Sequence, residues 1–145
     1  MFSKSNLLST LVTALWAFFG GYLLWGLLGD SYLVNHLGSA DITVKEVPDF
    51  THLTIGCILV AFAFSTIFSK WSRGAHSISQ GVEFGIWIGV LIGFGNGIID
   101  FATIGVLDIE GTLVNGVIYV VFYLVMGILA SIVYKKTSGG QSGSE

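Results

Sequence analysis

Four long uncharged runs of apolar residues, separated by short polar segments, dominate the chain. A helix of ~20 residues crosses a hydrocarbon core of ~30 Å, and each run is close to that length. The runs predict membrane-spanning helices over residues 7–28, 53–69, 84–104 and 112–134. We therefore expect an all-α fold, a transmembrane four-helix bundle that forms a single domain over residues 1–136.

The polar segments limit how these helices are arranged. The second and third connections are short, so consecutive spans are expected to be antiparallel neighbours. The longer first connection contains the only proline, Pro48, and its pattern predicts a short surface helix around residues 31–37. The polar C-terminus, residues 137–145, is expected to be a flexible tail or a remnant of cloning.

Composition narrows the class of protein. Of the 145 residues, 53% are hydrophobic and 10% are charged, whereas about a quarter of the residues in soluble domains are charged. These values exclude a soluble enzyme, a nucleic-acid-binding protein and a secreted disulfide scaffold, and they make the lipid bilayer the expected partner. The single cysteine, Cys57, lies in an apolar run and is interpreted as a small buried hydrophobic residue.

The basic residues are distributed unevenly along the chain. Five of the six lie at the N-terminus, in the second connection or at the C-terminus, and the sixth, Lys45, lies in the first connection. Because basic residues concentrate on the cytoplasmic side of a membrane, we expect both termini to be cytoplasmic, N-in and C-in. Acidic residues then gather on the outer side, where we interpret them as the charges left when basic residues are excluded.

The third span carries glycine at every fourth position. These residues, called the glycine ridge below, are Gly81, Gly85, Gly89, Gly93 and Gly97. Association of helices in lipid depends on close backbone approach, so this pattern predicts a glycine zipper that packs against another helix. In a regular α-helix the ridge drifts by ~40° per step, so we expect either one partner that crosses right-handed or two partners that share the ridge.

The fourth span carries a stripe with the same period. This polar stripe consists of Asn115, Tyr119, Tyr123, Gly127 and Ser131. A tyrosine hydroxyl in the middle of a bilayer needs a partner, and its ring suits a groove made by missing side chains. We expect the stripe to pack on the glycine ridge, with Tyr119 level with Asn96 and Tyr123 near Gly93.

Three polar groups are expected to meet near the outer ends of the third and fourth spans. Asn96 and Asp100 lie one turn apart, Asn115 enters at a similar depth, and His52 begins the second span nearby. Such a group can be a structural hydrogen-bonded cluster or a site for an ion, a proton or a ligand, and both interpretations stay open.

Sequence patterns typical of catalysis or of cofactor binding are absent. The chain has no HExxH, no GxSxG and no paired cysteines. His36, Asp41, Asp49 and His52 are interpreted as ordinary solvated residues. We expect no enzyme activity, no metal site and no cofactor.

The chain resembles a group of small four-span bacterial membrane proteins of unknown function. The resemblance covers residues 7–134 and rests on the glycine ridge and on WGLLGDSYL, PDF, IFSKW and FATIG. It implies a location in the bacterial cytoplasmic (inner) membrane and brings no activity with it. Our main functional hypothesis is a non-enzymatic module that self-associates or serves as an accessory subunit of a larger membrane complex. The alternative is a small cation or solute channel or transporter, formed by an oligomer, with its outer site around Asp100.

Overall fold

The computed structural model describes residues 3–41 and 47–138, and the regular structure of these residues is helical apart from one isolated bridge. Four helical segments in this part of the chain are long and apolar enough to cross a membrane: Lys4–His36, Phe50–Trp71, Ile78–Thr103 and Ile109–Thr137. The predicted all-α fold with four apolar helices is confirmed. Each predicted span overlaps one of these segments.

Two of the four long segments are divided into several elements, and the other two begin and end beyond the predicted spans. In chain order the elements are α1 (Lys4–Gly21), the π-helical η1 (Tyr22–Gly29), α2 (Asp30–Leu33), the 3-10 helical η2 (Val34–His36), α3 (Phe50–Trp71), α4 (Ile78–Gly89), the π-helical η3 (Val90–Asn96), α5 (Gly97–Thr103) and α6 (Ile109–Ser138). The expected surface helix over residues 31–37 is therefore a continuation of the first segment. Because α6 extends through Ser138, it includes the start of the expected tail, and residues 139–145 lie outside the described residues.

Polar side chains mark where the long helices begin. The Ser3 hydroxyl accepts a hydrogen bond from the Asn6 backbone N–H, and Asp49 accepts from the backbone N–H groups of Thr51 and His52. Ser77 and Gln80 form a capping box at the start of α4. Such caps satisfy the N–H groups that have no partner within the helix, so the helices begin several residues before the apolar runs.

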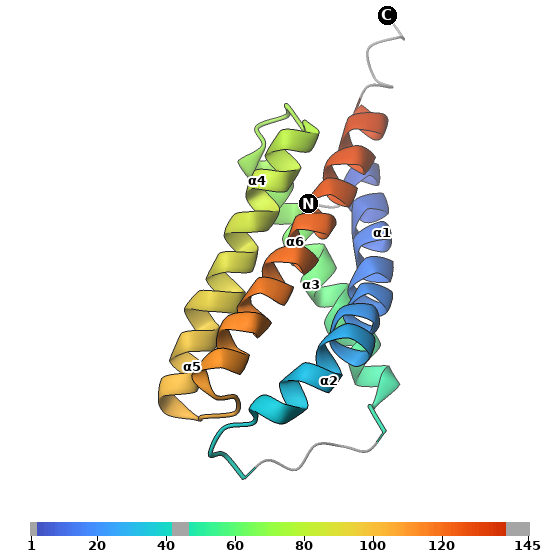
Figure 1. Ribbon diagram of the computed structural model, residues 1–145. Helices are drawn as coiled ribbons and strands as arrows, with labels where there is room; N and C mark the ends of the chain where they lie inside the picture. Colours follow the sequence, from blue (N-terminus) through green and yellow to red (C-terminus); the bar gives the residue numbers. More distant parts are fainter. Residues whose placement is uncertain (1–2, 42–46, 139–145) are drawn as a thin grey trace, which may run out of the picture.

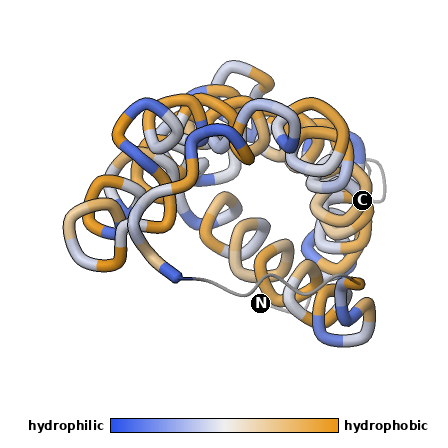
Figure 2. The backbone as a smooth tube through the Cα atoms, turned by 60° about the horizontal axis from the view of Figure 1, so that its bottom comes forward, coloured by the Kyte–Doolittle hydropathy of each residue, from blue (hydrophilic) through white to orange (hydrophobic). Residues whose placement is uncertain are grey.

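The long helices form a curved row in which α4 packs along α6, α6 along α1, and α1 along α3 (Figure 1). Hydrophobic residues occur along all of them (Figure 2), and apolar side chains face outward. Leu59 on α3 is 63% exposed and Leu91 on η3 is 65% exposed. An apolar exterior of this extent is stable only in contact with lipid or with another apolar surface. These features indicate a multi-pass membrane protein.

Helix α3 departs from the expected compact bundle. It contacts α4 and α6 near its C-terminal end, where Phe64 and Phe68 pack against Phe84 with ring centroids 4.9 and 5.5 Å apart. The N-terminal half of α3 is exposed from Phe50 to Val60 except at the half-buried Cys57. The large rings hold α3 close to α4 at one end only, so these consecutive helices are not packed neighbours along their whole length.

The two ends of the bundle differ in construction. One end, called the terminal end, carries both described chain ends and the connection between α3 and α4, and the other, called the clasp end, carries the first and third connections (Figure 1). At the clasp end Leu37 pairs with Leu107 in an antiparallel bridge, and the Gly38 N–H donates to the Val106 carbonyl at 2.8 Å. A Cβ on Gly38 would collide with the Gly105 carbonyl, so only glycine permits this pairing.

Side chains reinforce the clasp. The Tyr32 hydroxyl donates to Glu110 at 2.8 Å, and His36 Nδ1 lies 3.0 Å from Asp108 Oδ2. The backbone N–H of Gly111 and the His36 ring both lower the pKa of Asp108, which favours its charged form. His36 and Asp108 therefore join the first connection to the third, and His36 is not the ordinary solvated residue that the sequence suggested.

Candidate functional site

The glycine ridge lies against α6. A Cβ on Gly89 would lie 2.5 Å from the Val120 Cα, and one on Gly93 would lie 2.6 Å from the Tyr119 Cβ. A Cβ on Gly85 would collide with the Tyr123 carbonyl. The backbones of α4 and α6 thus approach so closely that side chains do not fit between them.

The π-helical segment η3 explains how one helix covers the ridge. A four-residue step overshoots a full turn in an α-helix, but it falls short of a full turn in a π-helix, whose hydrogen bonds join residues i and i+5. The ridge passes from α4 into η3 after Gly89. The drift is therefore reversed halfway along the ridge, and a Cβ on Gly97 would still lie only 3.6 Å from the Thr112 side chain of α6.

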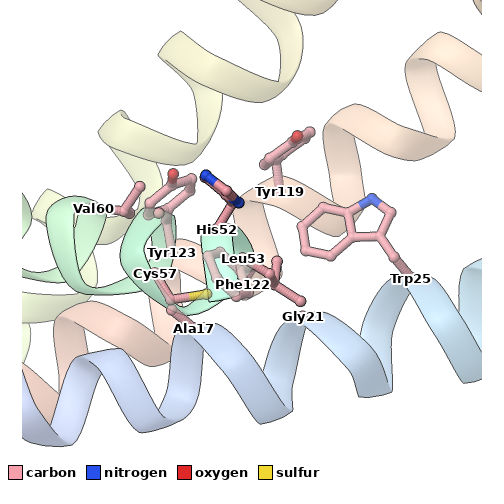
Figure 3. Close-up of a pocket in the computed structure, with 11 residues that line it drawn as sticks. Ala17, Gly21, Trp25, His52, Leu53, Cys57, Val60, Tyr119, Phe122 and Tyr123 are labelled. Carbon is pink, nitrogen blue, oxygen red and sulfur yellow. The ribbon is translucent and has the colours of Figure 1, made fainter. Parts of the chain in front are cut away.

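The residues of the polar stripe on α6 face two different surroundings, the glycine ridge and a cavity. Gly127 and Ser131 face the ridge at Gly81, but the rings of Tyr119 and Tyr123 point away from the ridge, into a cavity (Figure 3). The expectation that these rings fill the glycine groove is wrong, because the α6 backbone itself occupies the groove.

The alignment of the two helices also differs from the expected one by about one turn. Tyr119 lies level with Gly93 rather than Asn96. The expected alignment assumes that the third span ends at residue 104 and the fourth begins at residue 112, whereas α5 ends at Thr103 and α6 begins at Ile109. The connection is thus tighter than the apolar runs indicated.

The cavity lies between α1, α3 and α6 and has a volume of about 450 Å³ (Figure 3). This lateral cavity is lined mainly by apolar groups, and three of the candidate residues, His52, Tyr119 and Tyr123, contribute to its wall. Small residues create the space. Gly21 on α1 and Gly56 on α3 both line it, and a Cβ on either residue would meet no atom within 4 Å.

The polar groups of the lateral cavity differ in how they are satisfied. The Trp25 Nε1–H donates to Asn115 Oδ1 at 2.7 Å, and His52 Nδ1 lies 2.7 Å from Asp49 Oδ2. Among residues 3–41 and 47–138, neither the Tyr119 nor the Tyr123 hydroxyl makes a hydrogen bond to the protein. Tyr123 is only 6% exposed, and among the described residues its hydroxyl oxygen is not one of the fully enclosed, unbonded atoms, so the hydroxyl remains accessible to a partner from outside the protein.

The predicted outer polar group is assembled in part. Asn96 Nδ2 donates to Asp100 Oδ2 at 3.0 Å. Asp100 and Asn115 line one small cavity of about 130 Å³ at the clasp end, although Asn115 bonds to Trp25 and not to Asp100. His52 does not line this small cavity, and its side chain is 81% exposed.

A second polar group, at the terminal end, was missed in the sequence. Asn6 Nδ2 donates to Thr66 Oγ1 at 3.0 Å, and the Ser9 and Ser65 hydroxyls are 2.9 Å apart. The Tyr134 hydroxyl donates to Asn6 Oδ1 at 2.9 Å. All five side chains are buried. The first span does carry small polar residues at helical spacing, which could have indicated this group. Serine and threonine are common in apolar spans without such partners, so their presence alone did not predict a buried polar group.

The connection between α3 and α4 holds a buried histidine. His76 Nδ1 lies 2.7 Å from the Ser72 hydroxyl, and the ring stacks on Tyr134 with centroids 4.7 Å apart. Burial lowers the pKa of His76 below its ordinary value of 6.5, so the ring is neutral at pH 7. His76 adopts a left-handed backbone conformation with φ of 39°, which is costly for a residue with a Cβ.

The lateral cavity can accommodate an apolar molecule, to which the hydroxyls of Tyr119 and Tyr123 can donate hydrogen bonds. In the described part of the chain, no three His, Cys, Asp or Glu side chains are placed to hold a metal ion. Comparisons with protein-family models, with curated proteins and with solved structures find no match to this chain.

Proposed function

We propose that this protein is a non-enzymatic membrane module that binds a lipophilic molecule in the lateral cavity. The observation that carries the proposal is an apolar space of about 450 Å³ that is open to the outside of the helix row and bordered by two tyrosine hydroxyls, neither of which bonds to a described residue. Ligand sites are typically apolar spaces of this size with a few placed polar groups.

The construction of the helix row supports the proposal. Gly85 and Gly89 bring α4 and α6 into backbone contact and form a close-packed frame. Helix α3 is held to that frame at the terminal end and stands away from it along the cavity. A rigid frame with one separated helix gives a membrane molecule lateral access to an internal site.

A photoreactive alkane carrying a diazirine tests the proposal in nanodiscs. Labelling of the cavity wall around Cys57 is expected to saturate and to be displaced by excess unreactive alkane, whereas labelling at lipid-facing Leu91 is not. Gly56→Leu fills the cavity and removes the saturable labelling. Gly95→Leu, on an open face of η3, is the matched control and retains it. Labelling that is equally unsaturable at both sites contradicts a binding cavity.

Association with other copies, or with a larger complex, is a separate proposal. The glycine ridge is covered by α6 of the same chain, so a second copy has to use another surface. The exposed half of α3 is the apolar surface nearest the cavity. The mass of the detergent-solubilised particle distinguishes a monomer, a homo-oligomer and a heteromeric complex.

We also propose the bacterial inner membrane as the location, with both termini cytoplasmic. The support is the resemblance to small bacterial four-span proteins together with the five basic residues at the terminal end.

One observation favours the alternative of a cation pathway. Asp100 borders the 130 Å³ cavity beside Thr112 and Asn115, so a charged group and two polar groups meet there. Asp100→Asn keeps the shape and hydrogen bonding of the side chain but removes its charge. If Asp100 serves a cation, proteoliposomes under sodium, potassium or proton gradients lose flux with this variant while the fold persists. Wild-type protein that passes no ion under these gradients rules the pathway out.

A further inference from the structure

The tyrosine hydroxyls of the lateral cavity constrain the ligand more than its volume does. Tyr123 is 94% buried, as its exposed fraction of 6% implies, and no hydrogen bond from its hydroxyl to the described residues forms. Tyr119 stands one turn away, with its ring nearly parallel to that of Tyr123 at an interplanar angle of 14°. Figure 3 shows both hydroxyls on the side away from α1. Two donors therefore face the same space without protein acceptors.

The depth of Tyr123 in the membrane makes an unpaired donor costly. Tyr123 lies near the middle of α6 (Ile109–Ser138), ~21 Å of helical rise from Ile109. A hydrocarbon core is ~30 Å thick, so its centre is ~15 Å from the ester groups at the interface. An ester oxygen of an ordinary phospholipid cannot reach Tyr123, whereas a small molecule dissolved in the hydrocarbon can.

The cavity walls indicate the shape of that molecule. Trp25 packs against Tyr119 with ring centroids 4.7 Å apart and against Phe122 at 5.3 Å, and all three residues line the cavity. Aromatic faces and edges favour contact with a flat ring. A hydroxyl donor needs an acceptor, and a carbonyl oxygen is an acceptor that brings no further donor into hydrocarbon.

We propose that the lateral cavity binds a lipophilic ring carbonyl compound of the quinone class, with a carbonyl oxygen that accepts a hydrogen bond from Tyr123. Tyr119 supplies a second donor on the same side, and the aromatic residues contact the ring. The inference concerns binding alone and requires no electron transfer. It rests on the proposed function and adds the chemical class of the ligand.

Two matched probes test the inference in detergent-solubilised protein. One is 2,3-dimethyl-1,4-naphthoquinone, whose methylated ring positions cannot add to the Cys57 thiol, and the other is 2,3-dimethylnaphthalene, which lacks the oxygens. Quenching of tryptophan fluorescence gives the apparent Kd of the quinone, and reversal of the quenching gives that of the hydrocarbon. We expect the quinone to bind ~3–10-fold more tightly, the ratio that one net hydrogen bond supplies.

Variants assign the difference to the hydroxyl. Tyr123→Phe is expected to weaken quinone binding ~3–10-fold and to leave hydrocarbon binding unchanged. The control is Tyr22→Phe, which removes a hydroxyl from a ring that is 63% exposed and lies outside the cavity. Tyr119→Phe gives an independent second measurement in case Tyr123→Phe alters the fold.

The outcomes separate the two proposals. Equal affinity for both probes, or quinone binding that neither tyrosine variant weakens, overturns the carbonyl inference but leaves a lipophile site in place. If neither probe binds to the wild type, or if Gly56→Leu binds both as well as the wild type does, the proposed function fails as well.

Discussion

At the residue scale, the glycines of this chain fall into two groups that the sequence does not distinguish. Gly85 and Gly89 touch the α6 backbone, whereas a Cβ on Gly56 would meet no atom within 4 Å and one on Gly95 would make only an ordinary contact of 3.8 Å with the Val90 carbonyl. Their spacing could be read from the sequence, but the neighbours of each residue could not. The two groups therefore respond to the same substitution in opposite ways.

Gly85→Ala is expected to destabilise the protein by about 1–3 kcal/mol, because its Cβ collides with the Tyr123 carbonyl and the helices must separate. Gly95→Ala is expected to be neutral or to stabilise by up to ~1 kcal/mol through helix propensity. Thermal unfolding of both variants in the same detergent measures the difference. Equal effects would show that α4 and α6 do not meet at the ridge.

His76 predicts a pH dependence of stability. Its pKa is lowered in the folded protein, so as pH falls through 6.5 the unfolded chain takes up a proton before the folded one does. Stability is therefore lost as pH falls below about 6.5 and levels off below the folded pKa. Carboxylates with lowered pKa values, such as Asp108, also lose their contribution to stability as pH falls, but they do so in a separate pH range below their ordinary pKa of 3.8.

Melting temperatures at pH 7.5 and 5.5 test this expectation. His76→Asn removes the titrating ring and suits the left-handed backbone at this position, so the variant should lose the pH dependence in this window. His52→Asn is the control, because that side chain is 81% exposed. An unchanged slope in His76→Asn contradicts the assignment.

At the scale of elements, the existence of each long helix could be predicted and its contacts could not. Runs of apolar residues predict a span because the backbone must satisfy its own hydrogen bonds in lipid. They do not predict the π-helical turns of η3, which depend on tertiary packing. They also gave no signal that Asn6 and Tyr134, 128 positions apart, bond across α1 and α6.

A double-mutant cycle of Asn6→Ala and Tyr134→Phe tests that contact. Polar contacts within membrane proteins average about 0.6 kcal/mol and reach about 1.7 kcal/mol, so a coupling energy in this range is expected. The measurement is unfolding by denaturant in mixed micelles. Tyr22→Phe, which lies on the lipid-facing surface, should show no coupling to Asn6→Ala. Additive effects of the main pair indicate that the contact does not form.

At the scale of the whole molecule, the four apolar helices and the end of the bundle at which each connection lies could be predicted, but the open row of helices could not. The apolar runs are similar in length and composition, so nothing in them indicates that α3 separates from α4. The lateral cavity results from that separation together with Gly21 and Gly56, which belong to no four-residue glycine repeat. For the same reason, the candidate residues Tyr119 and Tyr123 could be identified from sequence while their surroundings could not.

Cysteine labelling tests the orientation. Single cysteines replace Ser39 at the clasp end and Ala75 at the terminal end, both exposed, in a Cys57→Ser background. Ala75 is preferable to Ser77, which caps α4. An impermeant thiol reagent added to intact cells should label position 39 alone. Labelling of position 75 alone reverses the orientation.

Helix α3 contacts α4 and α6 at one end only, whereas α1 packs along it. At the terminal end, Ser65 and Phe68 make its contacts with α1 and α6. Near the clasp end, the Phe50 ring contacts Phe18 with centroids 6.4 Å apart. Phe50 is ~27 Å of helical rise from Phe68, so a rotation of α3 by ~10° about its terminal end would move Phe50 by ~5 Å. Such a rotation would change the width of the cavity mouth, so side chains at the terminal end that do not line the cavity would influence access to it.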